Sequence, residues 1–516
     1  MKNLLSLLLF IFTLHTTQAQ NTRPWGDQGN GTYINPILNA DYSDPDVIRV
    51  GNKYYMVASD FHYIGMPVLE STDMVNWTII SQVYDRFDYP EWDHNKRFAG
   101  GSWAPSIRYH DGKFWVFFCT PHEGLFMSTA TDPHGPWSPL HLVEKVEKWE
   151  DPCPLWDDDG NAYLGRSRHG AGPIIIHRMS ADGRKLLDNG VTVYTGPVAE
   201  GTKFHKRDGY YYISIPEGGV STGWQTILRS RNIYGPYEKK VVLEQGSTIV
   251  NGPHQGALVD TPEGEWWFYH FQFIEPIGRV VHLQPAHWKE GWPVIGVDMD
   301  MNGIGEPVYT WKKPNVHTSA PITLPQTSDD FSSPTLGLQW QYNHNPYPQA
   351  VSLTERKGWL SLKALRADCL KMSHNMLTQK TMGYHSVATT RLDVSKLADG
   401  QRAGLLCNGN LFNGIGVMCE EGKKYLYLEK DGTIEKIQLV KGKIIYLRAT
   451  IDYPDNKHQL SYSADGHHYT DVGDAYSLKF GSWKGTRVGV YTYNTLTDAG
   501  TALFDYFNYI TDGPEI

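Results

Sequence analysis

A short pattern that recurs five times in the N-terminal half constrains the fold of this chain more than any other feature. Each copy begins with a polar or small residue, continues into an apolar strand, turns at or near Gly, and ends in an aromatic-rich strand. The copies begin 47 to 60 residues apart, at Asp44, Ala104, Asp151, Glu200 and His254. That spacing is typical of a four-stranded propeller blade with its loops. We predict an all-β fold with five blades arranged radially as a β-propeller.

Residues that open the five copies should meet at the centre of this propeller. The innermost strand of each blade faces the central axis, so Asp44, Asp151, Glu200 and His254 are expected to converge on one funnel. Asp-Pro and Glu-Gly are also ordinary turn sequences that end strands. For a single acid that structural interpretation is the simpler one, but three acids at corresponding places in different repeats favour a functional site.

A second region begins where the repeats end. Residues 321–327 contain Pro, Thr and Gln and have the composition of a linker. Beyond them, short strand patterns alternate with turns such as Asp431-Gly432 and Asp465-Gly466, which is typical of a β-sandwich. We predict a propeller domain over residues 20–320, a linker over 321–327 and a β-sandwich over 328–516.

The N-terminus has the pattern of an export signal. Lys2 supplies a positive charge, an apolar run follows, and Thr17-Gln18-Ala19 resembles a cleavage site. We predict a signal peptide over residues 1–19 and a protein exported to the periplasm or the medium. No later apolar stretch is long enough for a membrane anchor.

Composition narrows the choice of partner. The net charge is −9 and no run of Lys or Arg occurs, which argues against nucleic acid or an anionic membrane surface. Aromatic residues make up 13% of the chain, either as large β cores or as surfaces that stack on sugar rings. The five cysteines are odd in number and include no CxxC pair, so a zinc site or disulfide framework is not expected.

Together, the order and spacing of these motifs resemble glycoside hydrolase family 43, which contains β-xylosidases, α-L-arabinofuranosidases and arabinanases. The motifs that carry the resemblance are Asn35-Pro36-Ile37-Leu38, Ser43-Asp44-Pro45-Asp46, Trp103-Ala104-Pro105-Ser106-Ile107, Asp151-Pro152, Asp157-Asp158-Asp159-Gly160, Glu200-Gly201, Gly252-Pro253-His254-Gln255-Gly256 and Gly278-Arg279. The C-terminal region resembles the concanavalin-like, jelly-roll sandwich appended to exo-acting members. For that domain we expect a stabilising role rather than independent carbohydrate binding.

The resemblance implies a role for each acid. Asp44 is the general base, Glu200 the general acid, and Asp151 the residue that raises the pKa of the acid and orients it. The family resembles the inverting case, in which the base activates a water on the face of the sugar opposite the acid. A third carboxylate beside Glu200 would help to keep it protonated.

Five further residues are expected to bind the sugar. The resemblance implies that Arg279 binds hydroxyls of the terminal sugar and also pairs with Asp151. Trp103 and Phe61 are stacking surfaces or, alternatively, blade core. Gln255 follows the axial histidine, and Trp224 belongs to a loop expected to overhang the pocket.

His254 is the candidate metal ligand. In family members the corresponding His can bind a central calcium through water, and the alternative is a core His bonded to the backbone. No cofactor is required for the expected chemistry, and any calcium would be structural.

The sequence leaves the sugar open. Glu200-Gly201-Thr202 replaces the Glu-Gly-Pro-His of many β-xylosidases. Our leading hypothesis is an exo-acting, inverting α-L-arabinofuranosidase acting on arabinoxylan, arabinan or xyloglucan side chains. The alternative is a β-D-xylosidase on xylo-oligosaccharides, and a more distant one is a sugar-binding propeller without catalysis. The expected partner is an oligosaccharide or polysaccharide, and the sequence predicts no oligomeric state.

Overall fold

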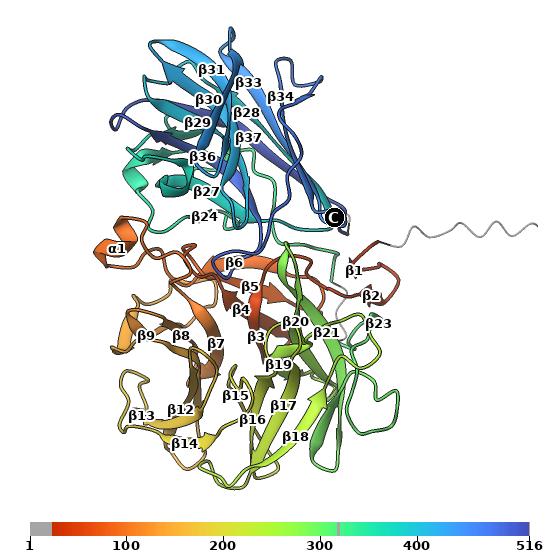
Figure 1. Cartoon of the computed structure of the whole chain (residues 1–516). Helices are drawn as coiled ribbons and strands as arrows, with labels where there is room; N and C mark the ends of the chain where they lie inside the picture. The colour runs from red at the N-terminus through yellow and green to blue at the C-terminus, as the bar shows by residue number, and fades with distance from the viewer. Residues whose placement is uncertain (1–22, 317–319, 515–516) are drawn as a thin grey trace, which may run out of the picture.

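The computed structural model describes residues 23–316 and 320–514 and contains two β domains (Figure 1). Five four-stranded sheets form the N-terminal domain, and two seven-stranded sheets form the C-terminal sandwich, drawn in teal to blue. The predicted fold class, a five-bladed propeller followed by a β-sandwich, is confirmed. The predicted signal peptide over residues 1–19 lies outside the described residues and stays a prediction.

Each blade consists of four strands that are consecutive in sequence. The first contains β3 (Ser43–Val50), β4 (Lys53–Ser59), β5 (Pro67–Ser71) and β6 (Thr78–Gln82). The second contains β7 (Trp103–His110), β8 (Lys113–Thr120), β9 (Gly124–Ala130) and β10 (His141–Glu144). The third contains β11 (Trp149–Trp156), β12 (Ala162–Arg168), β13 (Ile174–Met179) and β14 (Val191–Tyr194). The fourth contains β15 (Lys203–Arg207), β16 (Tyr210–Glu217), β17 (Trp224–Ser230) and β18 (Glu238–Leu243). The fifth contains β19 (His254–Asp260), β20 (Trp266–Ile274), β21 (Gly278–Lys289) and β22 (Trp292–Ile295).

The blades close into a ring through packing. The first strand of each blade is the innermost one: β3 contacts β7 and β19, and β11 contacts β7 and β15. Blades one and five meet through a buried apolar cluster in which the rings of Trp77 and Tyr269 lie edge to face, 5.8 Å apart. A small sheet of β1 (Gly26–Asp27), β2 (Thr32–Ile34) and β23 (Thr310–Lys312) brings the two ends of the propeller domain together.

The sandwich is built from two antiparallel sheets. The first, in spatial order, contains β24 (Gln341–Tyr342), β27 (Asn375–Lys380), β36 (Arg487–Asn494), β29 (Gln401–Asn408), β30 (Asn413–Glu420), β31 (Lys423–Lys430) and β32 (Thr433–Leu439). The second contains β25 (Val351–Ser352), β26 (Leu360–Lys363), β37 (Thr501–Thr511), β28 (His385–Asp393), β33 (Ile444–Asp452), β34 (Lys457–Ser463) and β35 (Thr470–Asp471). In β33 buried and partly exposed residues alternate, as expected for a strand with one face on a core.

Among residues 23–316 and 320–514, helices are few and short. They are α1 (Pro90–Asp93) and two 3₁₀ turns, η1 (Pro348–Ala350) and η2 (Leu370–Met372). Within the described ranges, no helix has the length and apolar character needed to cross a membrane. The cysteines are free thiols, and four of the five are buried.

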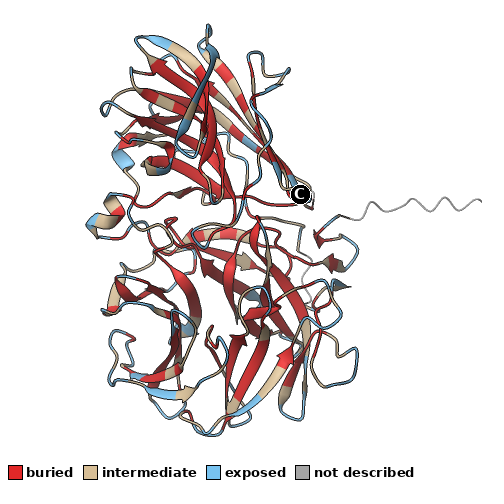
Figure 2. Ribbon diagram, viewed as in Figure 1, coloured by how far each residue is buried: buried red, intermediate tan, exposed pale blue. Residues whose placement is uncertain are grey.

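The two domains share one continuous core. The largest buried cluster contains Val47 and Trp267 of the propeller together with Leu377 and Phe504 of the sandwich. Figure 2 shows that buried residues occupy the inner strands of the blades and both sheets of the sandwich. Because this core spans both domains, the sandwich holds a fixed position on the propeller.

Candidate active site

The same backbone kink opens the first strand of every blade. At one position the residue adopts a left-handed conformation, with φ between 34° and 58°: Asp44, Ala104, Asp151, Gly201 and Gln255. In four of the blades the pairing register shifts at this point. Such a bulge redirects side chains, and each non-glycine residue in this conformation costs about 1–3 kcal/mol, a strain typical of functional sites. Glycine carries the kink at Gly201, where it costs little.

The position of this kink shows that the five sequence repeats were not aligned at equivalent residues. Glu200 and His254 precede the kinked residue, whereas Asp44 and Asp151 are the kinked residue itself. The structural counterpart of Glu200 in the third blade is therefore Glu150, not Asp151. The sequence pattern placed the fourth and fifth copies one residue out of register.

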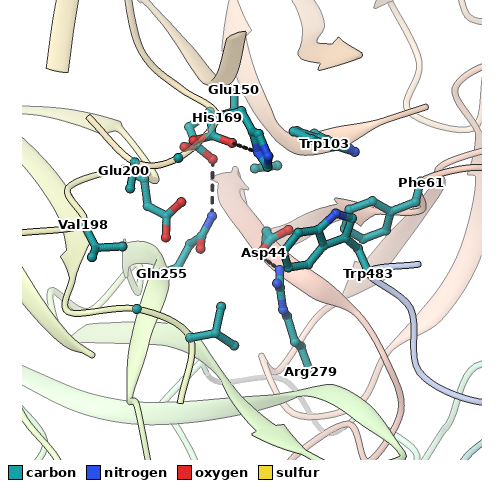
Figure 3. A pocket seen from close by; sticks show the side chains of 16 residues that line it. Asp44, Phe61, Trp103, Glu150, His169, Val198, Glu200, Gln255, Arg279 and Trp483 are labelled. Carbon is teal, nitrogen blue, oxygen red and sulfur yellow. Dashed lines mark hydrogen bonds and ion pairs between the residues drawn. The ribbon is translucent and has the colours of Figure 1, made fainter. Parts of the chain in front are cut away.

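The kinked strands surround a pocket of about 290 Å³ on the propeller axis (Figure 3). It is lined by Asp44, Phe61, Trp103, Ala104, Glu150, Asp151, His169, Gly170, Ala171, Val198, Glu200, Gly219, Val220, Gln255, Arg279 and Trp483. Seven of the nine predicted site residues are among them, and Trp224 and His254 are not. A pocket near 300 Å³ is at the small end of the range for small-molecule sites.

Asp44 is held from two sides. Arg279 lies on β21 of the fifth blade, and its Nη1 is 2.6 Å from Oδ1 of Asp44. The hydroxyl of Ser59 donates to Oδ2 at 2.6 Å. The expected pairing of Arg279 with Asp151 is therefore wrong, because the guanidinium pairs with Asp44. In Figure 3 this pair lies across the pocket from Glu200.

Glu200 and Asp151 form a second, separate acidic group. Burial raises the pKa of Glu200 to about 8, and the neighbouring charge of Asp151 adds to the effect, while Arg279 opposes it. The order of causes differs from our expectation, since burial contributes more than the third carboxylate. Burial also raises the pKa of Asp151, but the hydroxyl of Ser167, 2.5 Å from Oδ2, opposes that rise.

A fourth acid, Glu150, lines the same pocket and was not predicted. One of its carboxyl oxygens lies within 4.8 Å of one oxygen each of Asp151 and Glu200. Burial raises its pKa to about 10, with contributions from Asp151 and Glu200, so it is a neutral carboxylic acid at neutral pH. Nδ1 of His169, also unpredicted, lies 3.7 Å from its Oε2.

The apolar walls of the pocket come from both domains. Trp103 and Phe61 are 8% and 4% exposed, with ring centres 6.5 Å apart, and the ring of His169 lies 5.1 Å from that of Trp103. Trp483 belongs to the sandwich, so that domain contributes to the pocket as well as to stability. Gln255 reaches Oδ1 of Asp151 through Nε2, at 3.4 Å.

Trp224 lies behind the pocket wall rather than in it. Its ring packs against Gly218, where an added Cβ would lie 2.4 Å from the ring. The next residues, Gly219 and Val220, line the pocket. Trp224 therefore supports this part of the wall and does not itself line the pocket.

His254 is fully buried. Its Nδ1 lies 2.6 Å from the carbonyl oxygen of Gly252, and its Nε2 has no partner among the described residues. Burial lowers its pKa to about 4, so the ring is neutral. Calcium takes six to eight oxygen ligands, and among the described residues His254 belongs to no group of three ligand side chains. The predicted calcium would be held through water, so it stays a prediction, and no step of the proposed reaction depends on a metal.

Two family models match the chain. One is described as glycosyl hydrolases family 43 and matches residues 33–293, and the other as the beta xylosidase C-terminal concanavalin A-like domain and matches residues 328–510. A putative beta-xylosidase from Xylanibacter ruminicola is 61% identical, covering 92% of this chain and 88% of that protein. A beta-xylosidase from Formosa agariphila is 40% identical, covering 96% and 93%. The crystal structure of the GH43 BlXynB protein from Bacillus licheniformis has 27% identity and a TM-score of 0.80, covering 93% and 99%. The chain belongs to glycoside hydrolase family 43.

Proposed function

We propose that this enzyme is an exo-acting, inverting β-D-xylosidase that releases the terminal xylose of xylo-oligosaccharides. The observation that carries the proposal is the separation of two acidic groups across one small pocket. Asp44 is paired with a cation on one side, and Glu200 has a raised pKa on the other. Hydrolysis with inversion needs this pair, one carboxylate to activate water and one carboxylic acid to protonate the leaving oxygen.

The steps follow from the contacts of each group. Arg279 and Ser59 donate to Asp44 and fix its orientation, so that it can accept a proton from a water on one face of the sugar. Glu200, protonated below pH 8, gives its proton to the glycosidic oxygen on the other face. The charge of Asp151 raises the pKa of Glu200. Ser167 and Gln255 donate hydrogen bonds to the carboxylate of Asp151 and hold it in place.

Two observations support a terminal xylose. A pocket of about 290 Å³ suits the end of a sugar chain better than an internal segment. The relatives that are 61% and 40% identical carry the name beta-xylosidase. They favour the alternative from the sequence analysis over its leading hypothesis, so α-L-arabinofuranosidase becomes the second candidate.

The test is hydrolysis of p-nitrophenyl β-D-xylopyranoside against p-nitrophenyl α-L-arabinofuranoside by the purified protein. We expect a higher kcat/KM for the xyloside. A higher value for the arabinoside would reverse the assignment of the sugar. Undiminished hydrolysis of xylobiose by the Glu200→Ala variant, or no activity of the parent protein on either nitrophenyl substrate, would contradict the proposal.

A further inference from the structure

One loop of the sandwich reaches the pocket and contacts the partner of Asp44. The loop lies between β35 and β36 and carries Trp483, which stands beside Arg279 in Figure 3. The guanidinium of Arg279 lies 5.9 Å from the ring centre of Trp483 and 5.8 Å from that of Phe480. The sandwich therefore approaches the group that holds Asp44, as well as the space that the sugar would fill.

The next residue of the loop, Lys484, is buried behind Asp44. It is 2% exposed, and its Nζ lies 3.0 Å from Oδ2 of Asp41 and 3.5 Å from Oδ1 of Asp60. The same ammonium donates to the carbonyl oxygen of Ser59 at 3.3 Å. Ser59 is the residue whose hydroxyl donates to Asp44. Lys484 is thus one residue removed from Asp44 on this side.

Asp41 makes the connection on the other side. Its Oδ1 accepts the backbone N–H of Arg279 at 2.9 Å, and its Oδ2 accepts the backbone N–H of Gly485 at 2.9 Å. Burial opposes ionisation, but Lys484, Lys380 and these two N–H groups hold the pKa of Asp41 well below its ordinary value. One ionised carboxylate therefore fixes both the strand that carries Arg279 and the loop of the sandwich.

The loop packs closely against the propeller. An added Cβ at Gly485 would lie 1.7 Å from the carbonyl oxygen of Ile277, so only glycine permits this close approach of loop and propeller. The backbone N–H of Thr486 donates to the carbonyl oxygen of Pro276 at 3.1 Å. These contacts place Lys484 against Asp41 and Asp60.

We propose that Lys484 and Asp41 are positioning residues through which the sandwich fixes Asp44. The two groups that hold Asp44, Ser59 and Arg279, are each supported from behind by this ion pair. A buried ion pair is weak evidence for stability alone, because apolar replacements often stabilise as well or better. The Lys484–Asp41 pair contacts both Ser59 and Arg279, the two groups that hold Asp44, so it is placed to keep the geometry of Asp44 precise. The inference rests on the proposed function.

The cluster contains its own matched control. Lys380 is also buried, and its ammonium pairs with Asp60 rather than with Asp41. Lys484→Met and Lys380→Met each remove one amino group from the same buried cluster, and both should lower thermal stability. Lys484→Met should also lower kcat on p-nitrophenyl β-D-xylopyranoside by about 10- to 100-fold, as for a misplaced catalytic group, with a smaller change in KM. Lys380 pairs with Asp60 and acts on Asp41 through its charge alone, so Lys380→Met should lower kcat by no more than about threefold.

Conservative variants extend the test. Lys484→Arg keeps the charge and should recover part of the lost kcat. If Lys484→Met does not fold, Asp41→Asn replaces it: Asn has a single acceptor oxygen, so it keeps at most one of the two N–H bonds, and it loses the charge that pairs with Lys484. We expect a lower kcat there too, measured well below the unfolding temperature of each variant.

Each outcome decides the inference. Equal kcat values for folded Lys484→Met and Lys380→Met, or an unchanged kcat for folded Asp41→Asn, would reduce the ion pair to a structural role and overturn it. In that case the parent enzyme would still hydrolyse the xyloside. A folded parent protein without turnover on any pentoside would overturn the proposed function, and the inference with it.

Discussion

Asp151→Asn should shift the alkaline limit of activity to lower pH. Glu200 must carry a proton to act as the general acid, so activity should be lost as pH rises through about 8, the pKa to which burial and Asp151 raise this group. The substitution removes a negative charge while keeping the size of the side chain and an acceptor for Ser167. Because an ionised neighbour disfavours a second ionised carboxyl, its removal should lower the pKa of Glu200.

The size of the shift follows from the geometry. Oxygens of Asp151 and Glu200 lie within 4.8 Å of each other. Two unit charges at that separation repel by about 3.5 kcal/mol at an effective dielectric constant of about 20, which corresponds to about 2.5 pKa units. Glu200 is partly exposed to the pocket, and water screens the charges. We therefore expect a shift of about one to two units.

The assay is kcat/KM for p-nitrophenyl β-D-xylopyranoside as a function of pH, since that ratio reports the free enzyme. The control is Asp159→Asn, which removes an exposed carboxylate from a turn of the same blade and should leave the profile unchanged. An alkaline limit of Asp151→Asn that coincides with that of the parent enzyme, or lies above it, would refute this account of how Glu200 stays protonated.

Three further predictions concern the pocket. Trp483→Ala should lower kcat/KM by about tenfold on the xyloside, because it removes a ring of the sandwich from the pocket wall, and a change below twofold would exclude that contact. Glu150→Gln should keep kcat/KM at neutral pH within about threefold, because burial raises the pKa of Glu150 to about 10 and the native side chain is already neutral. Glu150→Lys should abolish activity, because it buries a charge in the pocket. Glu200→Ala should lower kcat by at least 100-fold on xylobiose but by less on the nitrophenyl xyloside, because the nitrophenolate leaving group needs less protonation. Equal losses of kcat on both substrates would argue against Glu200 as the general acid.

Much of the propeller could be predicted because each blade is encoded by one continuous stretch of sequence. Each copy carries its own strand pattern and Gly turn, so the count of blades follows from the sequence. The acids of the site could also be located, because Asp44, Asp151 and Glu200 stand at or beside the kinked position of their blades. A kink that recurs with the blade is visible in sequence as a recurring motif.

Glu150 was missed for a reason of strand geometry. In a regular strand successive side chains point to opposite faces, so an inward Asp151 implies an outward Glu150. The left-handed conformation of Asp151 breaks this alternation, and both side chains line the pocket. Trp103 and Ala104 in the second blade show the same behaviour.

The residues that the sandwich contributes to the pocket could not be predicted, because they depend on how the two domains dock. More than 300 residues separate Asp44 from Trp483 in sequence, and no local pattern links them. Their proximity results from the shared core and from the ion pair of Lys484 with Asp41. The position of Trp224 was misjudged for a different reason, since it is set by packing within the fourth blade against Gly218.

The most direct test of the central claim is the anomeric configuration of the first product. Hydrolysis of xylobiose by the parent enzyme should be followed by proton NMR, in a time short compared with mutarotation. An inverting β-xylosidase with Asp44 as base and Glu200 as acid should release α-xylose first from the non-reducing end. Initial release of β-xylose would contradict the role of Asp44 as a base that activates water, and the absence of xylose would contradict the proposed activity.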